Sequence, residues 1–237
     1  VEALVRWQHP QRGLVPPGEF IPLAEGCGLI LPIGRWILHS GCRQLASWAQ
    51  DPRQTGLTLA INVSARQFHH PDFVADVLAA LTESGADPQR LELELTESHL
   101  VEDVEGATAK MHSLKARGVR LSLDDFGTGY SSLSHLHRLP ISELKLDQSF
   151  VRDIDTSAIA RTLTSSVLRI GESLGMKVVA EGVETESQHR FLTEQRFPVL
   201  QGYLFSPPLL PAPLEHWLTE HRYTAAVEAG PAPVHAA

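Results

Sequence analysis

Short apolar runs alternate with longer amphipathic stretches along the whole chain. In the short runs, such as Leu91–Leu95 and Val119–Leu123, every second residue is Leu, Ile or Val, which is the period of a β-strand. The longer stretches repeat apolar residues with the 3.6-residue period of a helix that buries one face. Repeated strand–helix–strand units predict a parallel sheet with helices packed outside it.

Seven strands and six helices follow from these periods. The predicted strands are Ala3–Trp7, Leu57–Val63, Leu91–Leu95, Val119–Leu123, Glu143–Leu146, Lys177–Ala180 and Val199–Leu204. The predicted helices are Ile33–Ala49, Phe73–Ser84, Val104–Arg117, Ser131–His137, Ala158–Leu174 and Glu186–Gln195. Because the chain begins inside a predicted strand, we expect an α/β fold that is a TIM-like (β/α)8 barrel with its first strand region missing at the N-terminus. An open doubly wound sheet is the alternative.

Two segments have neither period. His9–Gly18 is rich in Pro and Gly and is predicted to be a loop. The end of the chain is rich in Ala, Pro, Val and Gly, and this composition is typical of a flexible segment. We therefore predict one domain over residues 1–222 and a flexible tail over residues 223–237.

Polar residues share one face of five predicted strands, because residues two apart in a strand point the same way. These polar positions are Asn62, Glu92, Glu94, Ser122, Asp124, Glu143, Lys145, Asp147 and Glu181. For a single strand, the alternative is a structural ion pair, such as Lys145 with a nearby glutamate, that only ties the barrel together. Recurrence on five strands favours a shared site at the carboxyl ends, where barrel enzymes place catalytic residues. Glu92 lies one step deeper than Glu94 and is interpreted as a lumen or ion-pair residue rather than a metal ligand.

The types of these residues indicate a metal site. Carboxylates at the end of a buried strand are costly unless a positive charge lies between them. Three carboxylates and one amide oxygen from four strands suit Mg²⁺ or Mn²⁺, and the candidate ligands are Glu2, Asn62, Glu94 and Asp124. Asp125 and Glu181 offer oxygens to a second ion. Two ions about 3.5–4 Å apart are typical of phosphodiester hydrolysis.

Two cations complete this prediction. Lys145 is placed to orient a water or to stabilise phosphate charge in an acidic mouth. Arg6 lies four residues after Glu2 with the same strand parity, and its guanidinium can bind a phosphate through two hydrogen bonds.

Composition limits the partners and the compartment. A net charge of −8 argues against duplex nucleic acid, because phosphate contacts need a basic surface. No apolar run approaches the length of a membrane span and no signal-peptide pattern opens the chain. Cys27 and Cys42 have no CxxC spacing, which favours free thiols in a reducing compartment. We expect a cytoplasmic domain whose parent protein carries any membrane anchor outside this chain.

Seven motifs in order along the chain make it resemble the EAL domain family of cyclic di-GMP phosphodiesterases. They are Glu2-Ala3-Leu4-Val5-Arg6-Trp7, Asn62-Val63-Ser64-Ala65-Arg66-Gln67-Phe68, Glu94-Leu95-Thr96-Glu97-Ser98, Asp124-Asp125-Phe126-Gly127-Thr128-Gly129-Tyr130-Ser131-Ser132-Leu133, Lys145-Leu146-Asp147, Ala180-Glu181-Gly182-Val183-Glu184-Thr185 and Gln201-Gly202-Tyr203. The resemblance implies a TIM-like barrel that hydrolyses one phosphodiester of cyclic di-GMP to give linear pGpG.

The resemblance also implies a role for each matched residue. Glu2, Asn62, Glu94 and Asp124 would bind the first ion, and Asp124, Asp125 and Glu181 the second. The implied catalytic residues are Lys145, Glu181 and Glu184, and the implied substrate-binding residues are Leu4, Arg6, Asp147 and Gln201. Glu97 would anchor the loop Phe126–Ser132, through which such domains form a homodimer. The family further implies a parent protein with sensory or GGDEF modules.

Two alternatives to this enzyme remain at this stage. A catalytically silent receptor for cyclic di-GMP, or a protein-interaction module, would share the fold but lack turnover; the intact set of acids favours the enzyme. A barrel glycosidase would need two carboxyls about 5–9.5 Å apart. It leaves Asn62, Lys145 and the adjacent Asp124 and Asp125 unexplained.

Overall fold

The computed structural model describes residues 1–96, 103–127 and 136–228. Its strands are β1 (Glu2–Ala3), β2 (Trp7–His9), β3 (Gly13–Val15), β4 (Leu59–Asn62), β5 (Leu91–Thr96), β6 (Arg120–Phe126), β7 (Glu143–Leu146), β8 (Lys177–Ala180) and β9 (Val199–Leu200). Its helices are α1 (Pro17–Cys27), α2 (Ile30–Trp48), α3 (Ala65–His69), α4 (Phe73–Ser84), α5 (Val104–Lys115), α7 (Gln148–Arg152), α8 (Ala158–Ser173), α9 (Glu186–Glu194) and α10 (Pro211–Glu228), with a short 3₁₀ helix at Pro88–Arg90. Residues 1–205 form one compact unit, and residues 206–237, which contain α10, form another.

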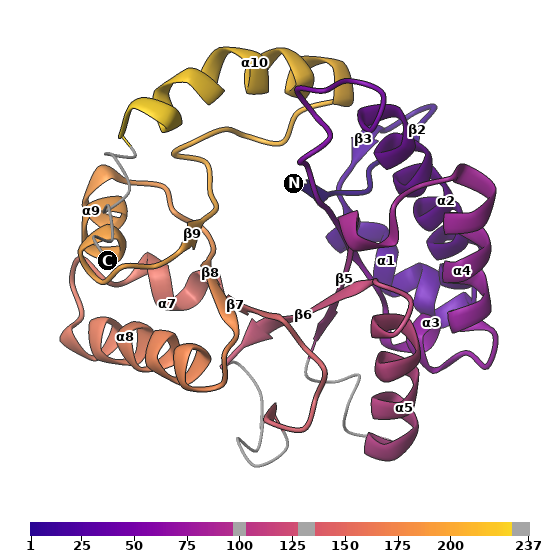
Figure 1. The fold of residues 1–237 in the computed structure, drawn as a ribbon, viewed down its shortest axis with the longest axis horizontal. Helices are drawn as coiled ribbons and strands as arrows, with labels where there is room; N and C mark the ends of the chain where they lie inside the picture. Colours follow the sequence, from indigo (N-terminus) through magenta and orange to yellow (C-terminus); the bar gives the residue numbers. More distant parts are fainter. Residues whose placement is uncertain (97–102, 128–135, 229–237) are drawn as a thin grey trace, which may run out of the picture. The chain divides into compact units, whose positions relative to one another are not determined.

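A curled parallel sheet organises the first unit (Figure 1). Within the described residues it has seven strands in the order β1-β4-β5-β6-β7-β8-β9, and every neighbouring pair is parallel. The predicted α/β class with a TIM-like sheet is thereby confirmed. We call the side of the sheet that carries Lys145 its inner face.

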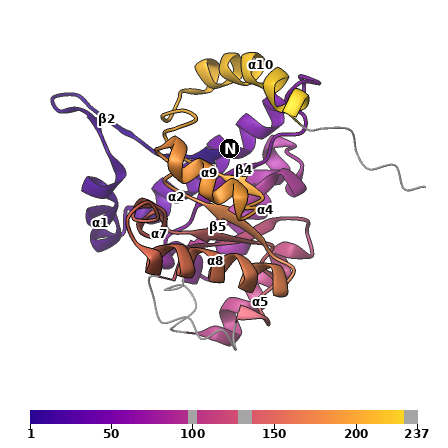
Figure 2. The same ribbon diagram turned by 90° about the vertical axis from the view of Figure 1, so that its left-hand side faces the viewer.

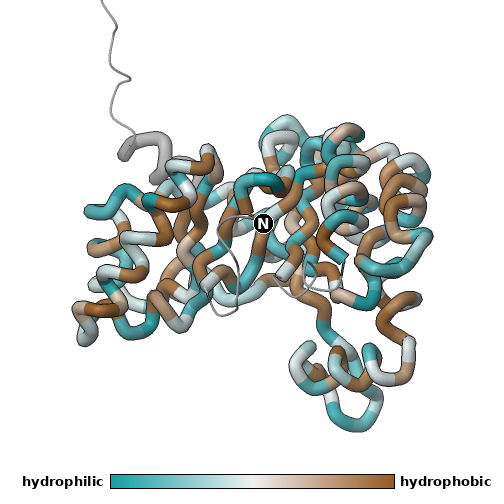
Figure 3. The backbone as a smooth tube through the Cα atoms, turned by 90° about the horizontal axis from the view of Figure 1, so that it is seen from below, coloured by the Kyte–Doolittle hydropathy of each residue, from teal (hydrophilic) through white to brown (hydrophobic). Residues whose placement is uncertain are grey.

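Helices cover the other side of the sheet, as the amphipathic pattern predicted (Figure 1). Helix α2 approaches β4 closely because Gly41 has no side chain, and Ile61 occupies the space that a Cβ would need. Helix α8 approaches β8 in the same way, with Gly171 against Val178. Figure 3 shows that the helical turns of the chain carry both hydrophobic and hydrophilic residues. Leu93 of β5 is fully buried under them, and burying one such side chain contributes about 1.5–3 kcal/mol.

The prediction of a loop over His9–Gly18 is wrong, because this segment forms secondary structure. Strands β2 and β3 pair as an antiparallel hairpin, and α1 begins at Pro17 directly after it. His9 Nδ1 accepts hydrogen bonds from the backbone N–H groups of Gln11 and Arg12, and Gly13 supplies a positive φ of 72°. The hairpin and α1 stand out from the sheet in Figure 2. Three-residue strands are too short to show a period in the sequence.

Other boundaries also differ from the predictions. Strand β1 covers only Glu2–Ala3, and β9 ends at Leu200 rather than at Leu204. Helices α1, α3, α7 and α10 were not predicted, and α10 includes the first residues of the stretch 223–237 that was predicted to be a tail. Most of the predicted helix Ser131–His137 lies outside the described residues. Among the described helices, none combines the length and apolar character of a membrane span.

Candidate active site

Lys145 lies at the centre of a cluster of acids on the inner face. Its Nζ is 2.7 Å from an oxygen of Glu94 and 2.7 Å from an oxygen of Glu181. Oxygens of Asp124 and Glu2 lie 3.5 Å and 3.6 Å away. The lysine side chain is 3% exposed, so four carboxylates from different strand ends surround a buried ammonium. The structure therefore brings together the acids that strand parity had placed on one face.

Two amides hold Glu2 in this cluster. Asn62 Nδ2 donates to Glu2 Oε1 at 2.7 Å, and Gln201 Nε2 donates to Glu2 Oε2 at 2.7 Å. Asn62 ends β4, the second strand in the sheet order, and Gln201 directly follows β9, the last, so the two donors come from strands far apart in the sheet. With both oxygens engaged, the Glu2 carboxylate has a fixed orientation. Gln201 therefore helps to orient an acid of the cluster, and its predicted contact with substrate stays a prediction.

The backbone turns sharply between the paired acids. Asp125 has a positive φ of 54°, and the pairing of β6 with β7 shifts register between Leu123 and Phe126. The Asp125 N–H donates to Asp124 Oδ1 at 3.0 Å. A non-glycine residue in this conformation is uncommon and costs energy that the surrounding structure must offset. The bend sends the two neighbouring carboxylates in different directions, with Asp124 toward Lys145 and Asp125 toward Asp147.

Burial and mutual repulsion change the protonation of these acids. Burial raises the pKa of Glu94 to about 9 and that of Glu181 to about 7, although Lys145 opposes both changes. Burial, Asp124 and Asp147 raise the pKa of Asp125. Burial would lower the pKa of Lys145, but the surrounding carboxylates outweigh it and raise that pKa. The cluster therefore holds more negative charge than one lysine can compensate, and it takes up protons.

The donor set fits a hard divalent cation. All of its ligand atoms are carboxylate or amide oxygens, which Mg²⁺ and Mn²⁺ prefer. Glu94 Oε2 is buried and receives no hydrogen bond from an N–H or hydroxyl group of the described residues, although the Glu94 carboxyl also shares a hydrogen bond with that of Glu2. As the side chains stand around Lys145, no three Asp, Glu, His or Cys residues in the described ranges are close enough together to hold an ion. Ion binding would thus require these carboxylates to turn from the ammonium.

The remaining predicted residues lie at the margin of the cluster. Leu4 is exposed, and Arg6 donates from Nη1 to its neighbour's backbone oxygen, Val5 O, at 2.9 Å. Asp147 caps α7 by accepting from the Ser149 N–H at 3.0 Å. The exposed Glu184 side chain makes no ion pair or hydrogen bond with the cluster within the described ranges. The predicted loop anchor Glu97, and most of the loop after Asp125, lie outside the described residues.

A second polar layer lies below the cluster on the inner face, and sequence reasoning found only part of it. Glu92 lies 3.9 Å from Arg120, which confirms its interpretation as an ion-pair residue. Glu143 lies 3.1 Å from Lys177, a pair that was not predicted. The register places Glu92 opposite Arg120 and Glu143 opposite Lys177. Strand parity identifies each acid, but pairing them requires the register between strands.

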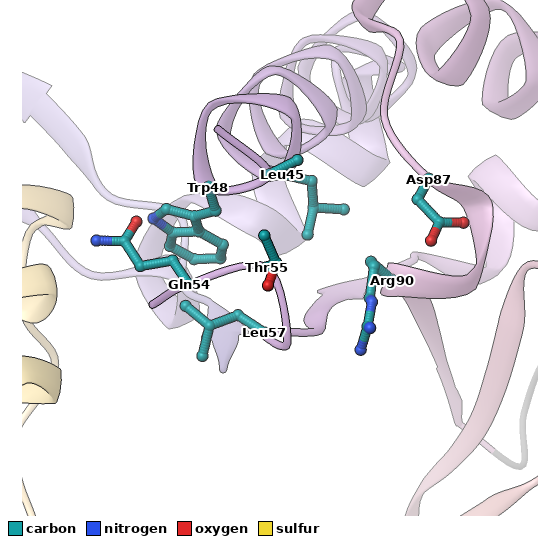
Figure 4. A pocket seen from close by; sticks show the side chains of 8 residues that line it. Leu45, Trp48, Gln54, Thr55, Leu57, Asp87 and Arg90 are labelled. Carbon is teal, nitrogen blue, oxygen red and sulfur yellow. The ribbon is translucent and has the colours of Figure 1, made fainter. Parts of the chain in front are cut away.

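A cavity of about 280 Å³ lies elsewhere in the fold (Figure 4). It is lined by the end of α2, the loop before β4 and the 3₁₀ helix before β5, with Trp48, Leu57 and Arg90 on its wall. These segments precede the strands, whereas Asn62 and Glu94 lie at or near the strands' carboxyl ends. This cavity is therefore separate from the acidic cluster.

Comparison with known families agrees with this geometry. The family model of the EAL domain matches residues 1–208 of this chain. The chain belongs to the EAL domain family. The match includes every described member of the acidic cluster, from Glu2 to Gln201.

Relatives of this EAL domain include named proteins and solved structures. It is 46% identical over 209 residues to the Pseudomonas aeruginosa protein named bifunctional diguanylate cyclase/cyclic di-GMP phosphodiesterase MucR, covering 88% of this chain but only 30% of that protein. A solved PaMucR phosphodiesterase in complex with c-di-GMP has a TM-score of 0.86 and 44% identity, covering 90% of this chain and 86% of that one. Klebsiella pneumoniae BlrP1, solved as a manganese and cy-diGMP complex, has a TM-score of 0.74 and 33% identity, covering 89% of this chain and 51% of that one.

The protonation of Glu94 and Glu181 predicts how stability depends on pH. In the folded state the pKa of Glu94 is about 9 and that of Glu181 is about 7, and both are above the ordinary value of 4.5. Each group therefore takes up a proton on folding at pH values between 4.5 and its folded-state pKa. The raised pKa of Lys145 contributes equally throughout this range, because the lysine is charged in both states below pH 10. The free energy of unfolding of the EDTA-treated domain is therefore expected to fall, by an amount on the order of a few kcal/mol, from about pH 5 to about pH 9. Urea unfolding across this range measures it.

Glu94→Gln is the matched control for this pH dependence. The amide resembles the protonated acid but cannot ionise, so the slope between pH 5 and pH 9 should become smaller. An equally steep slope in this variant would show that Glu94 is ionised in the folded protein throughout.

Gly202 allows Gln201 to reach Glu2. The backbone of Val183 lies where a Cβ of residue 202 would be, and the Val183 N–H donates to Gln201 O at 3.0 Å. Gly202→Ala is expected to lower the free energy of unfolding by about 1–3 kcal/mol, because the new methyl must displace backbone. In α1, a Cβ at Gly26 meets nothing within 4 Å, so Gly26→Ala should be neutral or stabilising in the same urea titration. Equal effects of the two changes would contradict the close approach.

Proposed function

We propose that this domain hydrolyses one phosphodiester of cyclic di-GMP to linear pGpG, with divalent ions bound at the acidic cluster. The observation that carries the proposal is the convergence of Glu2, Glu94, Asp124 and Glu181 on one buried lysine at the strand ends. Membership in the EAL family supports it, as do relatives whose names and complexes include cyclic di-GMP. Membership in this family also argues against the alternative of a barrel glycosidase.

Two Mg²⁺ or Mn²⁺ ions would be held by carboxylate and amide side chains of this chain. Glu2, Asn62, Glu94 and Asp124 would bind the first, and Asp124, Asp125 and Glu181 the second. The manganese complex of a relative supports the use of a divalent ion. Ions at this position would supply positive charge to the scissile phosphate and lower the pKa of a bound water.

The residues of the chain have separable tasks in this proposal. Lys145 keeps its proton, because four carboxylates surround it, and it can donate to a phosphate oxygen or to the attacking water. Asn62 and Gln201 fix the orientation of Glu2 by binding both of its oxygens. Leu4, Arg6, Asp147 and Gln201 would contact the dinucleotide, and Glu184 would complete the site.

The context of the domain is also part of the proposal. The chain spans about a third or less of the length of the first curated relatives that it matches, and this supports a parent with further modules, of sensory or GGDEF type. We expect a cytoplasmic domain that forms a homodimer through the loop after Asp125 and does not bind duplex nucleic acid. A catalytically silent receptor is the second candidate, and it differs only in lacking turnover.

Turnover separates the two candidates. The domain is incubated with cyclic di-GMP and Mg²⁺ or Mn²⁺, and pGpG is followed by chromatography. We expect pGpG to form with either ion and its formation to stop with EDTA. Tight binding of cyclic di-GMP without pGpG under any divalent ion would identify a receptor and overturn the proposed hydrolysis.

A further inference from the structure

Three buried polar atoms on the inner face are not hydrogen-bonded to any N–H, hydroxyl or carbonyl group of the described residues. They are Ser122 Oγ, Glu94 Oε2 and Glu92 Oε1. Ser122 is 0% exposed, and Glu92 and Glu94 are 4% and 3% exposed, so bulk water does not reach them freely. Leaving one buried donor or acceptor without a partner costs about 1–3 kcal/mol. One hydroxyl oxygen and two carboxyl oxygens therefore share a need for hydrogen-bond partners.

The register brings these atoms to one place. Glu94 of β5 is the direct partner of Ser122 of β6, and neighbouring strands are about 4.8 Å apart. Both residues are on the inner face, because Glu94 and Asp124 reach Lys145 and Ser122 lies two residues before Asp124. Glu92 lies two residues before Glu94 on the same face. The Ser122 hydroxyl thus lies beside an acceptor that needs a donor.

A single water satisfies such a set. A buried water makes about three hydrogen bonds to polar groups that otherwise lack partners. We propose that Ser122 is a positioning residue for Glu94. Its hydroxyl shares one ordered water with Glu94 Oε2, with Glu92 Oε1 as the third partner, and this holds Glu94 with its other oxygen toward Lys145. The consequence for ion binding rests on the proposed function, whereas the shared water does not.

The position of Ser122 distinguishes it from an ordinary buried hydroxyl. Thr164 of α8 is also 0% exposed, and its Oγ1 makes no hydrogen bond to a described residue. Thr164 lies on an outer helix, however, and no acid of the cluster is near it in sequence or register. It therefore provides a matched control, in which a buried hydroxyl is removed away from Glu94.

Variants of Ser122 test the positioning role by two readouts that do not require turnover. We expect Ser122→Ala to weaken Mn²⁺ binding, measured by calorimetry, by about 10-fold or more, as for other residues that orient metal ligands. Ser122→Thr keeps the hydroxyl and should restore the affinity, whereas Ser122→Cys keeps the volume but donates weakly and should resemble Ser122→Ala. Thr164→Val should leave the Mn²⁺ affinity unchanged. Wild-type affinity in both Ser122→Ala and Ser122→Cys would overturn the proposal.

A high-resolution crystal structure of the EDTA-treated domain decides the contact itself, even where a variant fails to fold. We expect a water within hydrogen-bond distance of both Ser122 Oγ and Glu94 Oε2, and its loss in Ser122→Ala. A structure without that water, and without a direct contact between the two side chains, would overturn the proposal. If the water is present but cyclic di-GMP is not hydrolysed, the proposed function fails and the positioning contact stands.

Discussion

Asp124→Ala is expected to lower the rate of cyclic di-GMP hydrolysis by a factor on the order of 10³ or more, with the fold retained. The reason is that Asp124 is the one acid proposed to contact both ions, and it also lies 3.5 Å from Lys145. Its removal leaves the scissile phosphate without correctly placed positive charge. Formation of pGpG under saturating Mn²⁺ measures the effect, and circular dichroism verifies the fold.

The matched control for this change is Asp153→Asn. Asp153 is an exposed acid whose partner is Arg152 at 3.4 Å, and exposed pairs contribute little. We expect near wild-type hydrolysis from this variant. Near wild-type hydrolysis from Asp124→Ala would instead show that the ligand assignment is wrong.

Lys145→Met is expected to destabilise the ion-free domain by about 3–5 kcal/mol at pH 8 and to abolish hydrolysis. Removing the cation leaves the carboxyls of Glu2, Asp124 and Glu181 buried together without compensation, which is the costly case for a buried ion pair, whereas Glu94 already holds a proton at this pH. The loss should be smaller at pH 5, because the acids can then take up protons. Urea unfolding in EDTA at the two pH values measures the difference.

Added Mn²⁺ should recover part of the stability of Lys145→Met, because an ion that binds the folded state supplies the missing charge. Lys115→Met, at an exposed position at the end of α5, is the control and should change the free energy of unfolding by less than about 0.5 kcal/mol. If Lys145→Met were as stable as Lys115→Met at pH 8, the carboxyls of the cluster would not need the lysine charge, and this expectation would be wrong.

The alternation of apolar and polar residues determined the class of fold, because parallel strands under helices leave a direct two-residue signature in Leu91–Leu95 and Val119–Leu123. This alternation did not predict the hairpin at Trp7–Val15. Its strands have three residues each, too few to show a two-residue period, and hydrogen bonds to His9 and the positive φ of Gly13 shape its turn.

The sequence alone also determined which acids share a face, since parity within a strand is a local property. It could not show that Gln201 reaches across the sheet to Glu2, or that Ser122 is the partner of Glu94. Both facts depend on register and curvature, which arise only when distant strands pair. The burial that raises the pKa of Glu94 has the same origin. The sequence thus determined the chemical types at the site, and the tertiary structure decided their partners and their charge.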